Sequence, residues 1–359
     1  MVKALYVPIL TGKLGEFSAL ASLPDDTRAV LRPVLDLPPI RRDDDPTNVI
    51  DTLLRRVGHA FGDDGLVAVD LQALEGSRAL DAHPVEFLLD RVAWSAVGVR
   101  LSVRTDAPAS YLDAVAEQHP RSRGVCVRAR VDEVTDPVDL RADVDAVLER
   151  LGLKRDGVHL CLDCGNLLGW GPRPDEVIAR HLDRDLSAFA LVSFCATSVP
   201  SNDQIRREER PNRFPRREWV AWRRLQAAGS VVVFGDYGIT GPRPTEPSTG
   251  RPDPNLRYTT DTALLIWRGW QPDRLTEEHA DEPSSFPDLC RELVRHEDFS
   301  GRDFSTGDEA YADIAAGERQ TRDGREAQGS PTDWVHWATN HHIVYVVDRL
   351  QRGGARPLT

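Results

Sequence analysis

Cysteine is scarce and irregularly spaced in this 359-residue chain. The five cysteines are Cys126, Cys161, Cys164, Cys195 and Cys290. An odd number without regular spacing does not indicate a disulfide framework. Cys161 and Cys164 match the C-x-x-C pattern of redox and zinc sites, but positions i and i+3 of a strand point to opposite faces. We therefore expect buried thiols.

Long apolar runs and a positive net charge are also missing. No run reaches the roughly 18 residues of a membrane span, and the N-terminal segment lacks the apolar region and cleavage site of a signal peptide. The net charge of −12 argues against a broad nucleic-acid-binding surface, which needs clustered Lys and Arg. We expect a cytoplasmic protein without membrane contact.

Several common catalytic patterns do not occur. The sequence has no G-x-S-x-G elbow, no H-E-x-x-H and no phosphate-binding G-x-x-x-x-G-K-[ST]. Tyr6-x-Pro8 stands in the first strand where a zinc-type barrel hydrolase would carry His-x-His, which disfavours zinc. Glycoside hydrolysis needs two carboxylates at a defined separation. Asp163 and Asp236 are candidates for such a pair, and their sequence spacing does not test it.

One pattern recurs throughout the first two thirds of the chain. Four to six apolar residues end at a polar or charged residue, and a helix-like segment follows. Eight such units predict a closed (β/α)8 TIM-type barrel. The runner-up is an open doubly wound sheet, but no Gly-rich fingerprint follows the first strand. The expected strands are Lys3–Leu10, Val30–Leu37, Leu66–Leu71, Val97–Val103, Val125–Val131, Val158–Leu162, Phe189–Ala196 and the VVVF of Ser230–Thr240.

The remainder of the chain predicts a large insertion after the eighth strand. Arg257–Trp267 is typical of a strand or hairpin, and Phe286–His296 of a short helix. Trp334–Arg349 has apolar residues at helical spacing. We interpret residues 1–240 as the eight strands with helices one to seven, and 241–332 as an insertion over the C-terminal face. Residues 333–359 would then form the final barrel helix and a C-terminal tail.

Several short motifs, in order along most of the chain, resemble the beta protein family, which is named after a bacteriophage protein. They are Tyr6-Val-Pro8-Ile-Leu10, Lys13-x-Gly15-Glu16, Gly235-Asp236-Tyr237, Arg257-Tyr258-Thr259, Trp267-Arg268-Gly269, Phe304-Ser305-x-Gly307-Asp308 and Asn340-His341-His342. The resemblance implies a place among phage-conflict, antiviral or mobile-element genes. It carries no catalytic assignment. The family's second strand often ends in Glu, where this chain has Asp36.

Residues at the carboxyl ends of barrel strands face the active site, so position nominates the candidate side chains. A ring of acids and arginines suits a polar ligand with an anionic group, which arginines hold and a carboxylate acts on. The expected catalytic residues are Asp163, Asp236, Tyr237 and His341. The expected ligand-binding residues are Lys13, Glu16, Asp36, Asp70, Arg104, Arg130, Arg213, Arg216, Arg257 and Arg268.

The best local signal for an anion is the segment Ile205–Arg224. It holds eight arginines and three glutamates, with Phe214, Trp219 and Trp222 between them. Barrels frequently bind phosphate near the loops after strands seven and eight, and Arg beside aromatic faces suits nucleotides or single strands. The alternative is a solvated start of a surface helix, with the two tryptophans packed on the sheet.

These observations lead to two hypotheses. The first is a barrel enzyme, a metal-assisted or acid/base hydrolase, that binds and processes a phosphate-bearing small molecule or nucleic-acid end; Mg²⁺ on Asp36, Asp70, Asp163 and Asp236 is the metal considered. The second is a non-catalytic sensor or binding module for a phage or partner protein, with Trp267, Trp270 and Phe286 in a dry aromatic surface. The sequence leaves both open.

Overall fold

The computed structural model describes residues 4–40, 44–62, 65–94, 97–182, 184–242, 253–270, 285–319 and 328–353. The chain forms two compact units, and each draws on three separate stretches of sequence. Unit 1 comprises Met1–Lys13, Asp25–Thr197 and Arg217–Tyr237. Unit 2 comprises Leu14–Pro24, Ser198–Arg216 and Gly238–Thr359. The units are described one at a time.

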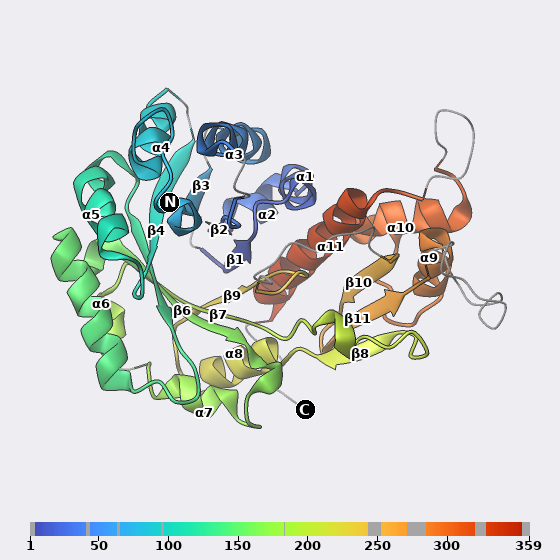
Figure 1. Ribbon diagram of the computed structural model, residues 1–359. Coiled ribbons are helices and arrows are strands. Elements are labelled where there is room, and N and C mark those ends of the chain that lie inside the picture. Colours follow the sequence, from blue (N-terminus) through green and yellow to red (C-terminus); the bar gives the residue numbers. More distant parts are fainter. Residues whose placement is uncertain are drawn as a thin grey trace. The chain divides into compact units, whose positions relative to one another are not determined.

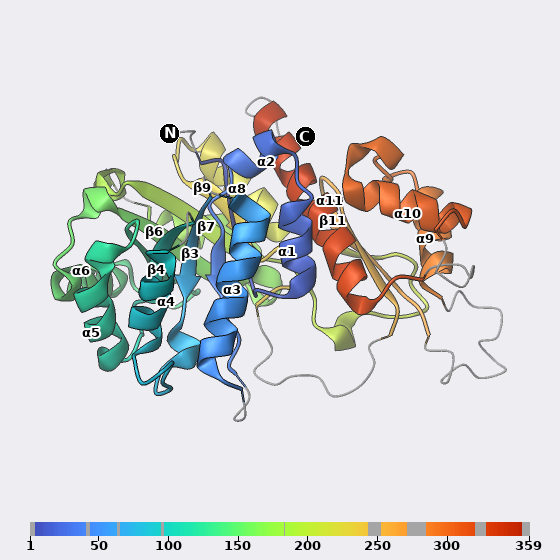
Figure 2. The same ribbon diagram turned by 90° about the horizontal axis from the view of Figure 1, so that it is seen from above.

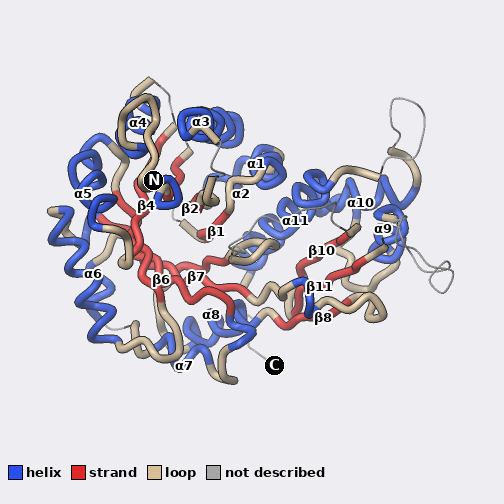
Figure 3. Tube along the Cα trace, viewed as in Figure 1, coloured by secondary structure: helices blue, strands red, loops and turns tan. Residues whose placement is uncertain are grey.

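Unit 1 is a closed barrel of eight parallel strands, as the sequence predicts. Strand β9 pairs with both β7 and β1, and the register Tyr6↔Phe234 closes the ring. Figure 3 shows these strands in red, and Figure 1 shows the helices outside them. The strands are β1 (Tyr6–Leu10), β2 (Val34–Asp36), β3 (Leu66–Asp70), β4 (Gly98–Arg104), β5 (Val125–Arg130), β6 (Val158–Asn166), β7 (Leu191–Thr197) and β9 (Val233–Asp236).

Side chains alternate between the barrel interior and the surrounding helices. The interior cluster consists of rather small residues: Val7, Ile9, Val34, Ala68, Cys126, Cys161, Cys195 and, at one end, Tyr237. All five cysteines are free and buried. Phe234 of β9 faces the surrounding helices instead. Its ring packs edge-on against Trp219 and Trp222 of α8 at centroid distances of 5.0 and 5.6 Å.

Two long helices of unit 1, α3 and α6, have clear start signals. Asp45 and Asp136 accept hydrogen bonds from the backbone N–H groups of Thr47 and Val138, and a proline follows each cap. A side-chain acceptor before a first-turn proline is a strong helix start. The helices are α2 (Asp25–Ala29), α3 (Pro46–Phe61), α4 (Pro84–Val92), α5 (Ala109–Gln118), α6 (Pro137–Leu151), α7 (Pro174–Ala179) and α8 (Arg217–Ala227). With six residues, α7 is much shorter than α6, with fifteen.

Closure of the barrel depends on Gly235. A Cβ atom there would clash with the Cys195 Sγ of β7 and lie 2.6 Å from the Val7 carbonyl oxygen of β1. Overpacking of this kind costs about 1–3 kcal/mol. We expect Gly235→Ala to lower the free energy of unfolding in urea by that amount. Gly169→Ala is the matched control, because its Cβ would meet no atom within 4 Å; equal effects of the two changes would contradict this account.

Unit 2 contains a three-stranded antiparallel sheet in the order β10–β11–β8. The strands are β8 (Asn212–Pro215), β10 (Asn255–Thr259) and β11 (Ala263–Arg268), so the hairpin expected over Arg257–Trp267 is present. The helices are α1 (Leu14–Ala21), α9 (Phe286–Val294), α10 (Thr306–Ala316) and α11 (Pro331–Arg352). Helix α10 lies within residues 241–332, the predicted insertion, at a place where the sequence analysis expects no helix.

The core of unit 2 joins the sheet to these helices. It includes Tyr258, Trp267, Phe286, Tyr311 and Trp337. Helix α11 contacts α1, α10 and β10, and Figure 2 shows α1 beside α11. The close crossing requires Gly15, whose Cβ would lie 2.5 Å from the Thr332 carbonyl oxygen. The boundaries at residues 240 and 332 remain predictions.

In the part of the chain that the structure describes, no helix combines the length and apolar character needed to cross a membrane.

Candidate functional site

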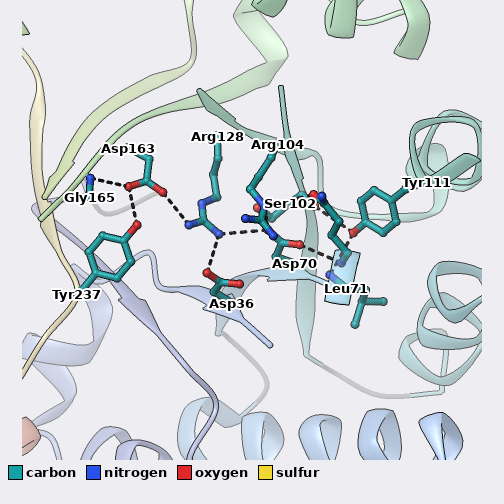
Figure 4. A network of polar contacts seen from close by, with 11 residues as sticks. Asp36, Asp70, Leu71, Ser102, Arg104, Tyr111, Arg128, Asp163, Gly165 and Tyr237 are labelled. Carbon is teal, nitrogen blue, oxygen red and sulfur yellow. Dashed lines mark hydrogen bonds and ion pairs between the residues drawn. The ribbon is translucent and has the colours of Figure 1, made fainter. Parts of the chain in front are cut away.

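A buried arginine occupies the centre of the candidate site at the carboxyl end of the barrel. Arg128 lies on β5 and is only 3% exposed. Its Nη1 atom lies 3.1 Å from Asp70 Oδ2 and 3.3 Å from Asp36 Oδ2, and its Nη2 atom lies 2.8 Å from Asp163 Oδ2. Figure 4 shows the guanidinium group between the three carboxylates. We call these four side chains the Arg128 cluster.

The strand register explains why these side chains meet. Asp36 is aligned with Asp70 across β2 and β3, and Arg130 with Asp163 across β5 and β6. Each of the three acids follows an interior residue at i−2, namely Val34, Ala68 and Cys161. Since residues at i and i+2 share a face, the acids and Arg128 all project into the barrel near the ends of their strands.

Further hydrogen bonds fix two of the acids. The Tyr237 hydroxyl donates to Asp163 Oδ1 at 2.5 Å, and the Gly165 N–H donates to the same oxygen at 3.2 Å. Asp70 Oδ1 accepts from the Gln72 N–H at 3.0 Å, and Asp70 Oδ2 lies 3.6 Å from Arg104 Nε. Asp70 and Asp163 are therefore held from several sides.

A buried tyrosine supports the turn that follows Asp70. The Tyr111 hydroxyl accepts from the Leu71 N–H at 3.1 Å and donates to the Ser102 carbonyl at 3.2 Å. Burial, with a smaller contribution from Asp70, raises the pKa of Tyr111 well above its usual value. The phenol therefore stays neutral and keeps its proton for the Ser102 carbonyl.

The electrostatics favour a charged arginine and a neutral Tyr237. Burial alone would lower the pKa of Arg128, but Asp163 and Asp36 help to raise it well above its usual value. Burial and the Asp163 carboxylate raise the pKa of Tyr237 well above its usual value, so its hydroxyl remains a donor. Burial also raises the pKa of Asp70, while Arg128 pulls it in the opposite direction.

Asp36 is the acid with spare hydrogen-bonding capacity. Its side chain is 21% exposed, compared with 1% for Asp70 and 14% for Asp163. Among the described residues, Asp36 contacts only the Arg128 guanidinium through an ion pair, and that contact uses one of its two oxygens. Asp36 is thus the most exposed acid of the Arg128 cluster, and its position is set by the ion pair with Arg128.

Two arginines lie beside the Arg128 cluster. The Arg104 side chain is 38% exposed and donates from Nε to Gln72 Oε1 at 3.2 Å. Arg130 is exposed. The hydrogen bond from Thr135 is the largest cause of the lowered pKa of Asp132, and the charge of Arg130 contributes to it. Arg104, Arg128 and Arg130 balance the three aspartates, so the formal charge of the whole group is zero.

The structure brings five of the sequence-predicted site residues together in unit 1: Asp36, Asp70, Arg104, Asp163 and Tyr237. Arg130 stands at the end of the strand that carries Arg128. Arg128 itself was missed, although the sequence contains a signal for it. An arginine two residues before the end of an apolar strand must face either the interior or the helices, and an interior arginine needs acids at neighbouring strand ends.

The side chains of Asp236 and Tyr237 point to opposite faces of the barrel wall. It is 2% exposed and accepts a hydrogen bond from the Tyr6 hydroxyl. Tyr6 stacks on Phe234, whose ring faces α8, whereas Tyr237 belongs to the interior cluster. Neighbouring strand residues point to opposite faces, so the structure does not bring Asp236 to Asp163. A catalytic role for Asp236 remains a prediction.

The other predicted residues do not join the Arg128 cluster. Lys13 is exposed at the end of a unit 1 segment. Five others belong to unit 2, where they contact its own backbone or side chains: Glu16 with Thr240, Arg213 with Asp298, Arg216 with the Thr260 carbonyl, Arg257 with the Ile239 carbonyl, and Arg268 with Asp253.

The Arg-rich segment is largely neutralised by acids from elsewhere in the chain. In unit 2, Arg207 pairs with Asp253, Arg210 with Glu292 and Arg213 with Asp298. In unit 1, Arg224 pairs with Asp175, and Arg217 donates to backbone carbonyls such as that of Leu167. The local excess of positive charge in the sequence therefore does not persist as an unpaired basic surface on the described residues.

His341 belongs to a second buried network, in unit 2. Its Nδ1 atom lies 2.8 Å from Asp308 Oδ2 and its Nε2 atom 2.9 Å from the Thr259 carbonyl oxygen. Tyr258 stacks on the ring at 3.8 Å and donates to Asp308 Oδ1 at 2.6 Å. His341 and Asp308 are fully buried. Both ring nitrogens lie within hydrogen-bond distance of oxygen atoms, one from a carboxylate and one from the backbone.

Neither network is a ready metal centre. Within the described ranges, no group of three or more His, Cys, Asp or Glu side chains is arranged to hold a metal ion.

Comparison with known proteins identifies a family. A search of curated proteins found no match. Among solved structures, the chain is similar to 3-dehydroquinate dehydratase from Geobacillus kaustophilus, with 13% identity, a TM-score of 0.38, and coverage of 69% of this chain and 85% of that one. It is also similar to a candidate fructose-1,6-biphosphate aldolase from Coccidioides immitis, with 15% identity, a TM-score of 0.35, and coverage of 66% and 77%. The family model described as Beta protein matches residues 6–348. Since this match spans nearly the whole chain, the protein belongs to the Beta protein family.

Proposed function

We propose that the carboxyl end of the barrel binds a phosphate-bearing ligand that also carries hydroxyl groups, such as a nucleotide or a nucleic-acid end. One observation supports this above all: the Arg128 cluster leaves one Asp36 oxygen without an ion-pair partner, and the arginines Arg104 and Arg130 stand at the ends of β4 and β5, next to Asp70 and Asp163 of the same cluster. Ligand sites of such barrels lie at this end of the strands.

The proposed roles follow from how strongly each group is already engaged. Arg104 and Arg130 hold the phosphate, because guanidinium groups match phosphate oxygens bidentately. Asp36 accepts a hydrogen bond from a ligand hydroxyl or from an attacking water. Asp70 and Arg128 fix the orientation of Asp36 and do not contact the ligand.

Hydrolysis of the bound ligand is the second part of the proposal. Asp36 acts as general base on water, and Asp163 with Tyr237 fixes the opposite side of the site. Mg²⁺ is usually held by one or two carboxylates together with substrate phosphates. Asp36 and Asp163, the two more exposed acids of the Arg128 cluster, are the residues that would meet an ion carried in by the ligand.

Binding is tested with a panel of phosphates on the full chain. Thermal shift and calorimetry are measured with inorganic phosphate, nucleotides, sugar phosphates and 5′-phosphorylated oligonucleotides, with and without Mg²⁺. Dephosphorylated forms of each compound are the ligand controls. We expect one phosphate class to bind, and Arg104→Ala or Arg130→Ala to weaken it about 10- to 100-fold, as expected for losing a charged hydrogen bond.

Arg55→Ala is the matched protein control, because Arg55 is an exposed arginine on α3 whose contact is Thr52. If Arg55→Ala weakened binding as much as Arg104→Ala, the assignment to the barrel mouth would be wrong. A panel without any binding would favour the alternative of a protein-binding module. Two aromatic residues considered for that module, Trp267 and Phe286, are buried in the core of unit 2.

Turnover is tested with Asp36→Asn, which keeps the shape of the side chain and leaves Arg128 two carboxylate partners. Loss of a general base lowers kcat by about 10²- to 10⁴-fold. We expect that fall with the phosphate class that binds, while the dissociation constant changes much less. An unchanged kcat in Asp36→Asn would show that Asp36 is not the general base. Unchanged binding in the two arginine variants would instead contradict the proposed phosphate site.

A further inference from the structure

A partly exposed tryptophan, Trp170, lies in the loop between β6 and α7 of unit 1. The loop begins after Asn166, the last residue of β6, and so follows the strand that contributes Asp163 to the Arg128 cluster. Loops that leave the carboxyl ends of the strands form the ligand sites of such barrels. Trp170 is not among the site residues that the sequence analysis predicts.

Hydrogen bonds fix the backbone on both sides of Trp170. The guanidinium group of Arg217, at the start of α8, donates to four carbonyl groups of this loop, those of Leu167, Leu168, Trp170 and Gly171. In addition, the Gly171 N–H donates to Glu133 Oε1 at 2.8 Å. A side chain on a fixed backbone loses less conformational freedom when a ligand packs against it, and this favours binding.

The Glu133 contact joins the Trp170 loop to the loop that follows Arg130. Arg130 is the last residue of β5, and Glu133 comes three residues after it. Arg130 is also aligned with Asp163 across β5 and β6. Trp170 and Arg130 therefore belong to neighbouring segments at the carboxyl end of the barrel, and these segments are hydrogen-bonded to each other.

The indole of Trp170 is not stacked on another ring. Within the described ranges, the hydrogen bonds of Trp170 are those of its backbone, and no aromatic side chain packs on its ring. Six other tryptophans are engaged: Trp219 stacks on Trp222, Trp334 stacks on Phe286, Arg207 lies over Trp270, and Trp267 and Trp337 belong to the core of unit 2. Trp94 is 92% exposed, but it precedes β4 and so stands at the amino end of the barrel.

We propose that Trp170 is a stacking platform for a nucleobase, so that the ligand at the carboxyl end of the barrel is a nucleoside phosphate. The inference rests on the phosphate site of the proposed function and adds a second point of attachment. Arg104 and Arg130 hold the phosphate, Asp36 accepts from a ribose hydroxyl, and the base lies on the indole. Every base has a π-face, so stacking accepts all of them. The platform therefore separates nucleotides from sugar phosphates and distinguishes little between bases.

The first measurement compares ligands with and without a base. Calorimetry on the full chain uses the four ribonucleoside 5′-monophosphates, ribose 5-phosphate and inorganic phosphate. We expect the nucleotides to bind about 5- to 150-fold more tightly than ribose 5-phosphate, the factor for stacking one base on an aromatic side chain. Equal binding of ribose 5-phosphate would overturn the inference and leave the phosphate site intact. A 5′-phosphorylated trinucleotide that binds more tightly than the mononucleotides would identify the end of a strand as the source of the base.

The informative variant is Trp170→Ala. It should lower the affinity for the nucleotides to that for ribose 5-phosphate, while the affinity for ribose 5-phosphate stays the same. Trp170→Phe keeps an aromatic face and should retain part of the difference, so that loss of the fold is excluded as the cause. Arg104→Ala should instead weaken the nucleotides and ribose 5-phosphate alike. Equal losses for both ligands in Trp170→Ala would overturn the assignment of a base platform.

Trp94→Ala is the matched control, because Trp94 is an exposed tryptophan of the same unit, and it should leave every affinity unchanged. Adenosine and uridine separate this inference from the phosphate site. They should bind more weakly than the nucleotides and lose affinity in Trp170→Ala by the same factor. If the phosphates failed to bind while the nucleosides responded to Trp170→Ala, the phosphate site would be wrong and the platform confirmed. If no nucleotide or nucleoside responded to Trp170→Ala, the platform would be wrong.

Discussion

Arg128→Met should destabilise unit 1 by about 3–5 kcal/mol, the cost of removing one partner from a buried ion pair. The guanidinium group of Arg128 contacts Asp36, Asp70 and Asp163, and Asp70 is as buried as Arg128 itself. Without the arginine, these carboxylates repel one another in a site from which water is mostly excluded. The measurement is the free energy of unfolding in urea at pH 7.

Two further variants separate charge from packing at this position. Arg130→Met changes an exposed arginine on the same strand, and surface changes are usually within about 0.5 kcal/mol. Arg128→Lys keeps the charge but replaces the planar fork with a point charge, so it should recover only part of the loss. If Arg128→Met were no more destabilising than Arg130→Met, the central role of Arg128 would be wrong.

Asp308→Asn should have a comparable effect on unit 2, about 3–5 kcal/mol, because it leaves the fully buried His341 ring without its carboxylate partner. The hydroxyl groups of Ser305 and Tyr258 also lose a charged acceptor. Unfolding is best followed by tryptophan fluorescence, since Trp267 and Trp337 belong to the core of unit 2. Asp313→Asn, a change on the same helix at a partly exposed acid, is the control.

The Asp308 carboxylate also predicts how the stability of the protein changes with pH. Burial would raise the pKa of Asp308, but His341, Ser305 and Tyr258 together lower it below its usual value. A carboxylate with a lowered folded-state pKa contributes stability above its unfolded pKa, about 3.9, and loses it as pH falls through the folded value. Between pH 7 and 3, Asp308→Asn should therefore lose less stability than the parent. Parallel curves for the two proteins would contradict this.

The sequence alone predicts the barrel, because apolar runs that end at a polar residue recur eight times. It could not decide which way individual side chains point. Asp236 and Tyr237 are neighbours and were both expected in the site, but strand alternation separates them: Tyr237 reaches Asp163, and Asp236 reaches Tyr6. Arg128 is not among the predicted site residues because it lies inside an apolar run. The prediction considered only charged residues at the ends of strands.

Partners that are distant in sequence explain the remaining differences. The Arg-rich segment has an excess of positive charge only when it is considered alone; Asp253, Glu292 and Asp298 neutralise three of its arginines. His341 was expected near the site, yet its ring is enclosed by Asp308, Tyr258 and the Thr259 carbonyl. No local pattern reveals such pairings, because they depend on how separate stretches of the chain come together.

The interleaving of the two units has a consequence for synthesis on the ribosome. Strand β1 emerges first, but it pairs with β9 only after Asp236 has been made, and α1 must wait for α11, which begins at Pro331. A nascent chain that pauses after Thr197 would carry unpaired edges on both β1 and β7. Open strand edges are the usual starting points of aggregation. This protein should therefore depend on chaperones during translation, and slowing its elongation should reduce its soluble yield.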